Sequence, residues 1–466
     1  SPALGSTRDG QVPIFTRKTA SAIAEQPFMN KQSFQRPAPE LASRRFAALG
    51  RLLFLSLAMF PALVRAEWQP HKIQQLNGQA ARFQLPAQFQ IVTERWNRVV
   101  AVPYIVNMPE KDRLLMLVGC DYPHRAFVLT SDDRGATWTD PRPARSGDDG
   151  KASIGLGTSL AYLGNGSLVF YETGSVGTGR PSRWFSSDYG QSWGDPVAIA
   201  RTSDEKPWSI WDPPLVDRHP GTGRLTQLAE TGYAQSGTSS QANIRFSTDE
   251  GQTWSQSIKV PQWQGVNEAY LFRAGNGDLL AACRTDVPKR LKGKTLDHYE
   301  GLGISISRDD GRRWSSVRKL YDYGRHHPSL VLMPNQDIVM TYVVRLGYVD
   351  DQNGFPQFGI EAVVSHDHGV TWDLDHRYLL HVWSGQRQGK TYWWPSSQAT
   401  SSVLLSDGSI LTAFGTGYRI QAGPQQPQAP RDAGLVRWRL NTARVNDERA
   451  IRDAAFDSDL RNVFDP

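Results

Sequence analysis

One eight-residue pattern, Ser-x-Asp-x-Gly-x-x-Trp, occurs five times in this chain at intervals of about sixty residues, and it restricts the fold more than any other feature. The five copies span residues 131–138, 186–193, 247–254, 307–314 and 365–372. The pattern suits a tight hairpin turn, because its Asp can accept backbone N–H groups, its Gly can adopt positive φ and its Trp can pack between neighbouring sheets. The motif is therefore a structural staple and not a catalytic group, and its repetition predicts a row of similar supersecondary units.

Each motif closes a unit that begins with two apolar strands separated by a turn. Residues 102–106 and 114–118 form such a pair ahead of the first motif. The 41 glycines, 15 tryptophans and 15 tyrosines also favour short strands joined by tight turns over helices. We therefore expect an all-β chain.

A sixth unit has the strands without the motif. It consists of residues 397–414 followed by 434–440, and residues 89–92 are placed to supply its missing strand and close a ring. A closed ring leaves only short, protected sheet edges. We predict a six-bladed β-propeller over residues 67–440 with five motif turns; an open β-helix and a seven-bladed ring are the alternatives.

Residues 1–66 differ in character from the rest of the chain. Basic residues precede an apolar run at 52–64, and Val64-Arg65-Ala66 resembles a small-residue cleavage site. The run is too short to span a bilayer as a helix, so we interpret 1–66 as a leader with a secretory signal peptide; a buried helix is the alternative. The mature protein is then periplasmic or secreted, and residues 441–466 form a charged tail or a short helix.

The charge balance argues against an extended basic surface. The formal net charge is +6, but residues 1–66 hold nine bases and three acids, so the rest of the chain is neutral. We therefore expect no nucleic-acid partner and no stable membrane insertion, and recognition of an anion must be local.

The two cysteines and the adjacent histidines specify no metal centre or other cofactor. Cys120 and Cys283 end equivalent strands in units one and four, so they face each other across a ring and are expected to stay unpaired. His326 and His327 point in opposite directions at a strand start, and no third ligand is suitably spaced. For His327, which precedes Pro328, we expect a conformational role or contact with substrate.

The candidate site lies where first strands begin and second strands end, because these positions converge near the axis on the face away from the motif turns. Acids, arginines and aromatic residues dominate there. They suit a sugar site, with carboxylates for acid and base work, guanidiniums for an acidic substituent and flat rings for the sugar face. The same residues also fit surface ion pairs, solvated carboxylates and interblade core.

The segment NEAYLFRAGNGDLLAACR, residues 267–284, resembles the sialidases, the propellers with Asp-box repeats. The resemblance covers about residues 95–440. It implies that Glu268 activates a nucleophilic tyrosine, that Arg284 and Arg345 belong to an arginine trio gripping a substrate carboxylate, and that Asp121 is the acid/base. The chain departs from the family where Ala101-Val102-Pro103 replaces an Arg-Ile-Pro stretch, and where Tyr392 lies near the nucleophile position but out of register. Arg98 and Arg125 are candidate replacements for the missing arginine.

The sequence hypothesis is an exported, sialidase-like exo-glycosidase that removes a terminal, acidic sugar from a glycan. The catalytic residues are expected to be Asp121, Glu268 and Tyr392. The substrate-binding residues are expected to be Arg98, Arg284, Arg345, Glu172, Glu230, Trp211, Asp212, His327 and Trp394. The alternatives are a non-catalytic glycan-binding propeller, and a polysaccharide lyase or another glycosidase on the same scaffold. A uronic acid or neutral sugar needs fewer arginines, and an inverting mechanism with two carboxylates needs no tyrosine.

Overall fold

The computed structural model describes residues 68–78, 81–174, 180–219, 221–236, 239–291, 300–346, 358–383, 398–419 and 430–441. The expected leader at residues 1–66, Tyr392, Trp394 and the expected tail beyond residue 441 lie outside these ranges. Within them, regular structure is β apart from the 3₁₀ turns η1 (Pro109–Lys111) and η2 (Lys289–Leu291). No helix in the described ranges is long and apolar enough to cross a membrane.

Four of the sheets are four-stranded antiparallel meanders in which neighbouring strands follow one another along the chain. The first sheet contains β3 (Val100–Met108), β4 (Arg113–Cys120), β5 (Arg125–Ser131) and β6 (Arg142–Pro143), and the second β7 (Gly157–Gly164), β8 (Ser167–Glu172), β9 (Ser182–Ser186) and β10 (Val197–Ala198). The third contains β11 (Leu215–Arg218), β12 (Leu225–Ser236), β13 (Ser239–Ser247) and β14 (Ile258–Gln264), and the fourth β15 (Val266–Arg273), β16 (Leu279–Thr285), β17 (Gly301–Ser307) and β18 (Arg318–Tyr321).

A fifth sheet has nine strands in the order β19-β20-β21-β22-β1-β2-β25-β24-β23. Its strands are β19 (Arg325–Leu332), β20 (Ile338–Arg345), β21 (Phe358–Ser365), β22 (Tyr378–Trp383), β1 (Gln69–Asn77), β2 (Ala81–Ile91), β25 (Arg431–Trp438), β24 (Ile410–Tyr418) and β23 (Thr400–Leu404). The expectation of six separate blades differs from this arrangement, because the β1–β2 hairpin joins the last two meanders into one sheet.

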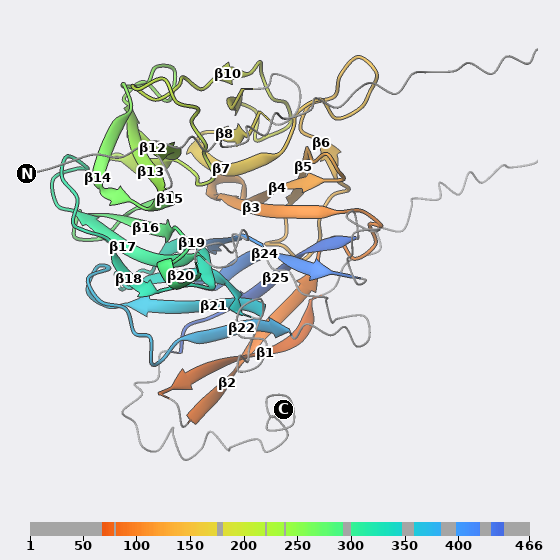
Figure 1. Ribbon diagram of the computed structural model, residues 1–466. Coiled ribbons are helices and arrows are strands. Elements are labelled where there is room, and N and C mark those ends of the chain that lie inside the picture. The colour runs from red at the N-terminus through yellow and green to blue at the C-terminus, as the bar shows by residue number, and fades with distance from the viewer. Residues whose placement is uncertain are drawn as a thin grey trace, which may run out of the picture. The chain divides into compact units, whose positions relative to one another are not determined.

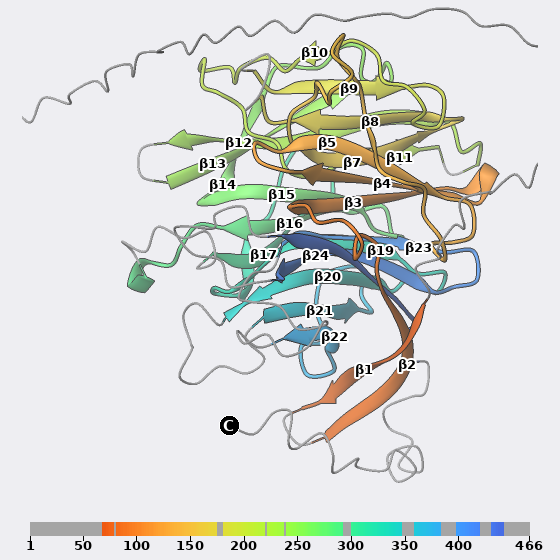
Figure 2. The ribbon, with the colours of Figure 1, turned by 90° about the vertical axis from the view of Figure 1, so that its right-hand side faces the viewer.

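The hairpin makes this join by pairing on both of its edges. Gln74 of β1 pairs with Leu379 of β22, and Phe89 of β2 pairs with Val436 of β25. The segment starting at Phe89 therefore supplies the strand that the sequence analysis assigned to it. Figures 1 and 2 both show the hairpin, in red and orange, beside β22.

The first strands of successive meanders contact one another in a closed cycle, β3, β7, β11, β15, β19, β23 and again β3. In Figure 1 the sheets follow one another in this order, from orange through yellow, green and cyan to blue. The predicted all-β propeller fold is thus confirmed. The apolar core lies between neighbouring sheets: Leu117 of β4, for example, packs in one cluster with Phe170 of β8 and Trp184 of β9.

The repeated motif forms the same turn each time, between the third and fourth strands of a meander. In the second copy, Ser186 Oγ accepts the N–H of Gly190 at 3.0 Å, and Asp188 Oδ1 accepts the N–H of Ser192 at 2.9 Å. Gly190 has φ 77°, a conformation that glycine adopts without strain. Trp193 is buried in the cluster between the first two sheets, as its position in the motif predicts.

Candidate active site

The centre of the candidate site is a buried ion pair across two neighbouring strands of the fourth sheet. Glu268 of β15 lies directly opposite Arg284 of β16 in the antiparallel register. Arg284 Nη1 donates to Glu268 Oε1 at 2.6 Å, and both side chains are less than a tenth exposed. The structure therefore brings together two residues that the sequence analysis placed in the site, and each already binds the other.

A second carboxylate, Glu300, shares Arg284. The Nε of Arg284 pairs with Glu300 Oε2, and Asn267 Nδ2 donates to Glu300 Oε1 at 2.8 Å. The sequence analysis missed Glu300 because it searched only first and second strands. The third strand of a meander starts at the edge where the second ends, so an acidic residue just before β17 is the signal that points to this position.

His327 completes the cluster from β19. Its Nδ1 lies 3.0 Å from Glu268 Oε2, and its Nε2 lies 3.1 Å from Arg284 Nη1. Arg284 can only donate, so Nε2 is the acceptor and the ring proton is on Nδ1. Burial lowers the pKa of His327 despite the opposing charge of Glu268, which keeps the imidazole neutral.

His327 owes this position to an irregularity in its strand. The register of β19 against β20 shifts between His326 and Ser329, and His327 has φ 52°. Thr400 Oγ1 donates to the carbonyl oxygen of His327 at 2.9 Å, which ties the irregularity to β23. The expectation that His327 belongs to the site is compatible with this placement, where it contacts Glu268 and Arg284.

Glu268 is ionised even though it is buried. Burial by itself would raise the pKa of Glu268, but the positive charge of Arg284 and the hydrogen bonds from His327 and Arg284 lower it to about 2. A carboxylate held in this way is available as a base or nucleophile over the whole physiological pH range.

The pKa of Asp212, in the same cluster, is shifted in the opposite direction. Burial raises the pKa of Asp212 well above its usual range, and the negative charge of Glu268 adds to this effect, while Arg284 and the backbone of Ala269 oppose it. The side chain belongs to the segment that leads into β11 and is almost fully buried. When the pKa of one carboxyl group is raised and that of its neighbour is lowered, the first can act as the acid and the second as the base. Here these would be Asp212 and Glu268.

Two tyrosines that the sequence analysis did not select surround these carboxyl groups. Tyr104 of β3 donates from its hydroxyl to the carbonyl oxygen of Trp211 at 3.1 Å, and so positions the segment that carries Asp212. Burial, with the charges of Asp212 and Glu268, raises the pKa of Tyr104 well above its usual range. Tyr233 of β12 also lies within electrostatic reach of Glu268.

Arg345 and Trp211 lie at the border of the cluster. Arg345 ends β20, is buried, and contributes electrostatically to His327. Trp211 is half-buried, and its carbonyl oxygen, not its ring, makes the contact with Tyr104 described above. Both expected substrate-binding residues are therefore close to the site, without a contact that identifies a ligand.

Asp121 and Arg98 form a separate pair. Arg98 Nε and Nη2 donate to the two carboxylate oxygens of Asp121 at 2.9 and 2.6 Å. The hydrogen bonds from Arg98 lower the pKa of Asp121, whose side chain is 51% exposed. An ionised, solvated carboxylate has no proton to donate, so this geometry does not support the acid role that the resemblance implied.

Glu172 and Glu230 are buried and bound by protein groups instead of facing a ligand. Glu172 accepts hydrogen bonds from the Gly155 backbone and the Trp184 indole, both at 3.0 Å. Glu230 is fully buried, with Arg183 Nε at 3.0 Å and the Tyr171 hydroxyl at 2.9 Å on one oxygen. These contacts give both carboxylates a structural role, and their expected role in substrate binding stays a prediction.

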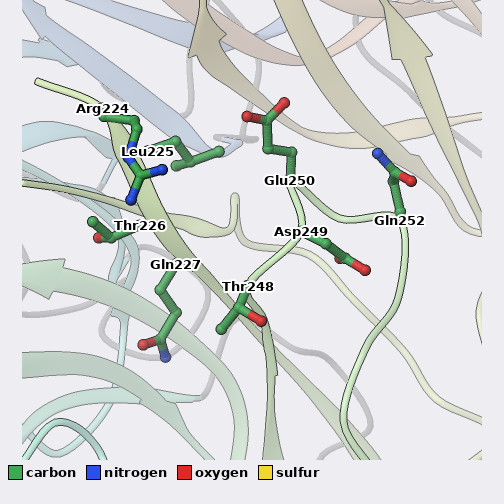
Figure 3. A pocket seen from close by; sticks show the side chains of 8 residues that line it. All are labelled: Arg224, Leu225, Thr226, Gln227, Thr248, Asp249, Glu250 and Gln252. Carbon is green, nitrogen blue, oxygen red and sulfur yellow. The ribbon is translucent and has the colours of Figure 1, made fainter.

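Within the described ranges, no group of three or more His, Cys, Asp or Glu side chains is arranged to hold a metal ion, and Cys120 and Cys283 are free, buried thiols. A polar pocket of about 460 Å³ lies between the start of β12 and the third motif turn, where Figure 3 shows Arg224, Gln227 and Glu250. It is at the turn face of the sheet, away from Glu268, and is not the candidate site.

Comparison with known proteins places the repeats in a described family. The model of the BNR repeat-like domain matches residues 182–451, more than half of the chain. A search of curated protein sequences finds no match.

Several solved structures share the fold at low sequence identity. A protein of unknown function from Dyadobacter fermentans is 16% identical with a TM-score of 0.56, over 74% of this chain and 96% of that one. A GH93 α-L-arabinofuranosidase of Fusarium graminearum, solved with arabinobiose, is 13% identical with a TM-score of 0.50, over 79% and 98%. The NanB sialidase of Streptococcus pneumoniae is 13% identical with a TM-score of 0.50, over 76% and 71%. At these identities the likeness concerns the fold alone.

Proposed function

This chain belongs to the BNR repeat-like domain family, and on that premise we propose that its propeller carries a glycosidase site in which Asp212 is the general acid and Glu268 the ionised carboxylate. The proposal is carried by two buried carboxyl groups that both interact with Arg284 and whose pKa values are shifted in opposite directions, that of Asp212 upwards and that of Glu268 downwards. Glycoside hydrolysis needs such a pair, one group to protonate the leaving oxygen and one to act at the sugar or on water.

The reaction follows from these protonation states. Asp212 gives its proton to the glycosidic oxygen as the bond from that oxygen to the anomeric carbon breaks. Glu268 either attacks the anomeric carbon, to be displaced by water in a second step, or removes a proton from the attacking water. Arg284 and His327 orient Glu268 and keep it ionised, while Tyr104 holds the backbone that carries Asp212.

Two substrate classes are candidates for this site, and the one that the sequence hypothesis favours is the sialidase-like removal of a terminal, acidic sugar. Its support is the sequence pattern that places Glu268 at the start of a first strand and Arg284 and Arg345 at the ends of second strands. A neutral sugar is the alternative substrate, because the Fusarium protein that shares the fold is an arabinofuranosidase. Tyr392 and Trp394 stay candidates for the nucleophile and a sugar platform on sequence grounds alone.

A panel of fluorogenic glycosides tests the proposal. It contains sialosides, uronides, arabinofuranosides and neutral hexosides, assayed with the parent protein and with Glu268→Gln. We expect turnover of at least one glycoside by the parent, and a loss of about 10² to 10⁴ in rate for the variant, as is typical for a catalytic carboxylate. Saturable binding of a glycan without turnover would instead favour a non-catalytic binding propeller, a candidate supported by the mutual pairing of Glu268 and Arg284.

We also propose that the chain is exported and cleaved near Ala66. The apolar run at 52–64 supports this, and the first described strand begins at Gln69, after the expected cleavage site. The mass of the mature protein recovered from the periplasm or the medium measures the cleavage point directly, and a retained leader would contradict it.

We further infer that the nine-stranded sheet is two blades joined by the β1–β2 hairpin, which we call the β1–β2 clasp. The propeller then has six blades in total. The closed cycle of six first strands supports this count, as does the pairing of β2 with β25, which gives the last meander its fourth strand. Deleting residues 68–80 removes β1 and spares the paired part of β2; folding with retained activity is the expected result.

A further inference from the structure

We propose that Glu300 determines the class of sugar that this site accepts: by holding Arg284 between two carboxylates, it directs the site to neutral sugars and away from sugars that carry a carboxylate. The inference rests on the proposed function, because it concerns the same site. It names a specificity residue that none of the sequence motifs indicated.

The first step is that Arg284 already binds two carboxylates of the protein. Its Nη1 donates to Glu268 Oε1 at 2.6 Å, and its Nε pairs with Glu300 Oε2. A guanidinium grips a substrate carboxylate best through two parallel N–H groups. Nε and Nη1 belong to different edges of the guanidinium, one formed by Nε and Nη2 and the other by Nη1 and Nη2. Because Nε faces Glu300 and Nη1 faces Glu268, neither edge can present both of its N–H groups to a substrate carboxylate.

The second step is the charge of the cluster. Arg284 and Arg345 carry two positive charges, and Glu268 and Glu300, which both pair with Arg284, carry two negative ones. The raised pKa of Asp212 and the lowered pKa of His327 both favour the neutral form, so neither residue adds a positive charge. The cluster therefore has no net positive charge that would offset the free-energy cost of desolvating an incoming substrate carboxylate. Such a group would lie near two fixed carboxylates, and specificity of this kind arises from repulsion as much as from attraction.

The third step is that Glu300 is held in place. Asn267 Nδ2 donates to Glu300 Oε1 at 2.8 Å, and only 13% of the Glu300 side chain is exposed. Asn267 lies beside Glu268 in β15, so one strand positions the base and braces the residue that neutralises Arg284. A buried, braced carboxylate cannot turn away to make room for a substrate carboxylate.

The test compares binding and turnover of acidic and neutral sugars in the parent and in Glu300→Gln. Binding of glucuronic acid, N-acetylneuraminic acid, L-arabinose and D-galactose is measured by ligand-observed NMR, and turnover with the matching aryl glycosides. Because binding does not require catalysis, failure of the proposed hydrolysis and failure of this inference give different results. The control is Asp310→Asn, which removes the same charge from a 68% exposed side chain paired with Arg273 at a motif turn.

We expect the parent to prefer the neutral sugars. Glu300→Gln should improve binding of the acidic sugars relative to the neutral ones by about 10- to 100-fold, the range for one charge-assisted hydrogen bond that Arg284 can then make. Asp310→Asn should leave the ratio of acidic-sugar to neutral-sugar binding unchanged. If Glu300→Gln fails to fold, Asn267→Ala removes the hydrogen bond that holds Glu300 in place. This variant should shift the ratio of acidic-sugar to neutral-sugar binding in the same direction by a smaller factor.

Three results would overturn the inference. They are a parent that already prefers the acidic sugars, a Glu300→Gln protein whose ratio equals that of the parent, and an absence of binding for both classes of sugar in parent and variant.

Discussion

Glu268 and Arg284 face each other across β15 and β16, with Arg284 Nη1 2.6 Å from Glu268 Oε1. This cross-strand pair places an ionised carboxylate and its counter-charge at the same sheet edge. Burial raises the pKa of Asp212, which reaches the cluster from the segment before β11, and the negative charge of Glu268 adds to this effect. The predictions below follow from this division of charge.

Asp212→Asn should lower the rate on glycosides with poor leaving groups by about 10² to 10⁴, because it removes the proton donor at nearly constant shape. Dinitrophenyl glycosides, whose leaving group needs little protonation, should lose much less. Steady-state turnover of paired substrates measures the difference, with Asp310→Asn as control. Equal losses on both kinds of substrate would eliminate Asp212 as the acid.

The pH dependence of turnover should show an alkaline limb set by Asp212 and no acid limb from Glu268 between about pH 3 and pH 6. An acid works only while protonated, so activity falls as the pH rises through the raised pKa of Asp212. Glu268 stays ionised down to about pH 2, the value of its lowered pKa. The kcat profile checks both limbs, and an unchanged alkaline limb in Asp212→Asn would contradict the assignment.

Asp121→Asn should have a small effect on turnover, because Asp121 is ionised and paired with Arg98 and so holds no proton to give. The role implied by the sialidase resemblance requires a loss of about 10² to 10⁴ instead. Turnover of one good substrate by both proteins decides between them, and a loss of that size would restore Asp121 as the acid/base.

The β1–β2 clasp should weaken in acid. His381 of β22 stacks on Phe89 of β2 with ring centroids 4.6 Å apart, and burial, with the neighbouring His71, lowers the pKa of His381 to about 3. Since the folded pKa lies below the unfolded value of 6.5, the stabilisation is present above pH 6.5 and is lost as the pH falls towards 3. His381→Phe should flatten the change in melting temperature over this range; an identical pH profile would refute the role.

Gly190→Ala should destabilise the propeller by about 1 to 3 kcal/mol. Gly190 has φ 77°, and an added Cβ would overlap Leu115 of the neighbouring sheet. Gly277→Ala is the matched control, because Gly277 also has positive φ, at 93°, but nothing lies within 4 Å of the added atom. Urea unfolding of both variants separates the overlap from the backbone strain, and equal losses would show that the overlap costs nothing.

The repeated turn could be predicted from the sequence because its interactions are local. Ser186, Asp188 and Gly190 hydrogen-bond within one stretch of eight residues, so the motif alone indicates the hairpin, and five copies indicate a propeller. Glu268 and Arg284 could also be placed together, since a first strand starts where its hairpin partner ends.

What the sequence determined by itself was therefore the short-range part: the turn chemistry, the strand order within each unit and the edge where charged residues gather. The tertiary structure decided which charges meet. It formed the ion pairs of Arg284 with Glu300, of Asp121 with Arg98 and of Glu230 with Arg183. It also joined two meanders through the pairing of β1 with β22. Contacts between distant segments, and the burial that raises the pKa of Asp212 while Arg284 lowers that of Glu268, leave no mark on a local pattern, because they arise only when the sheets pack against one another.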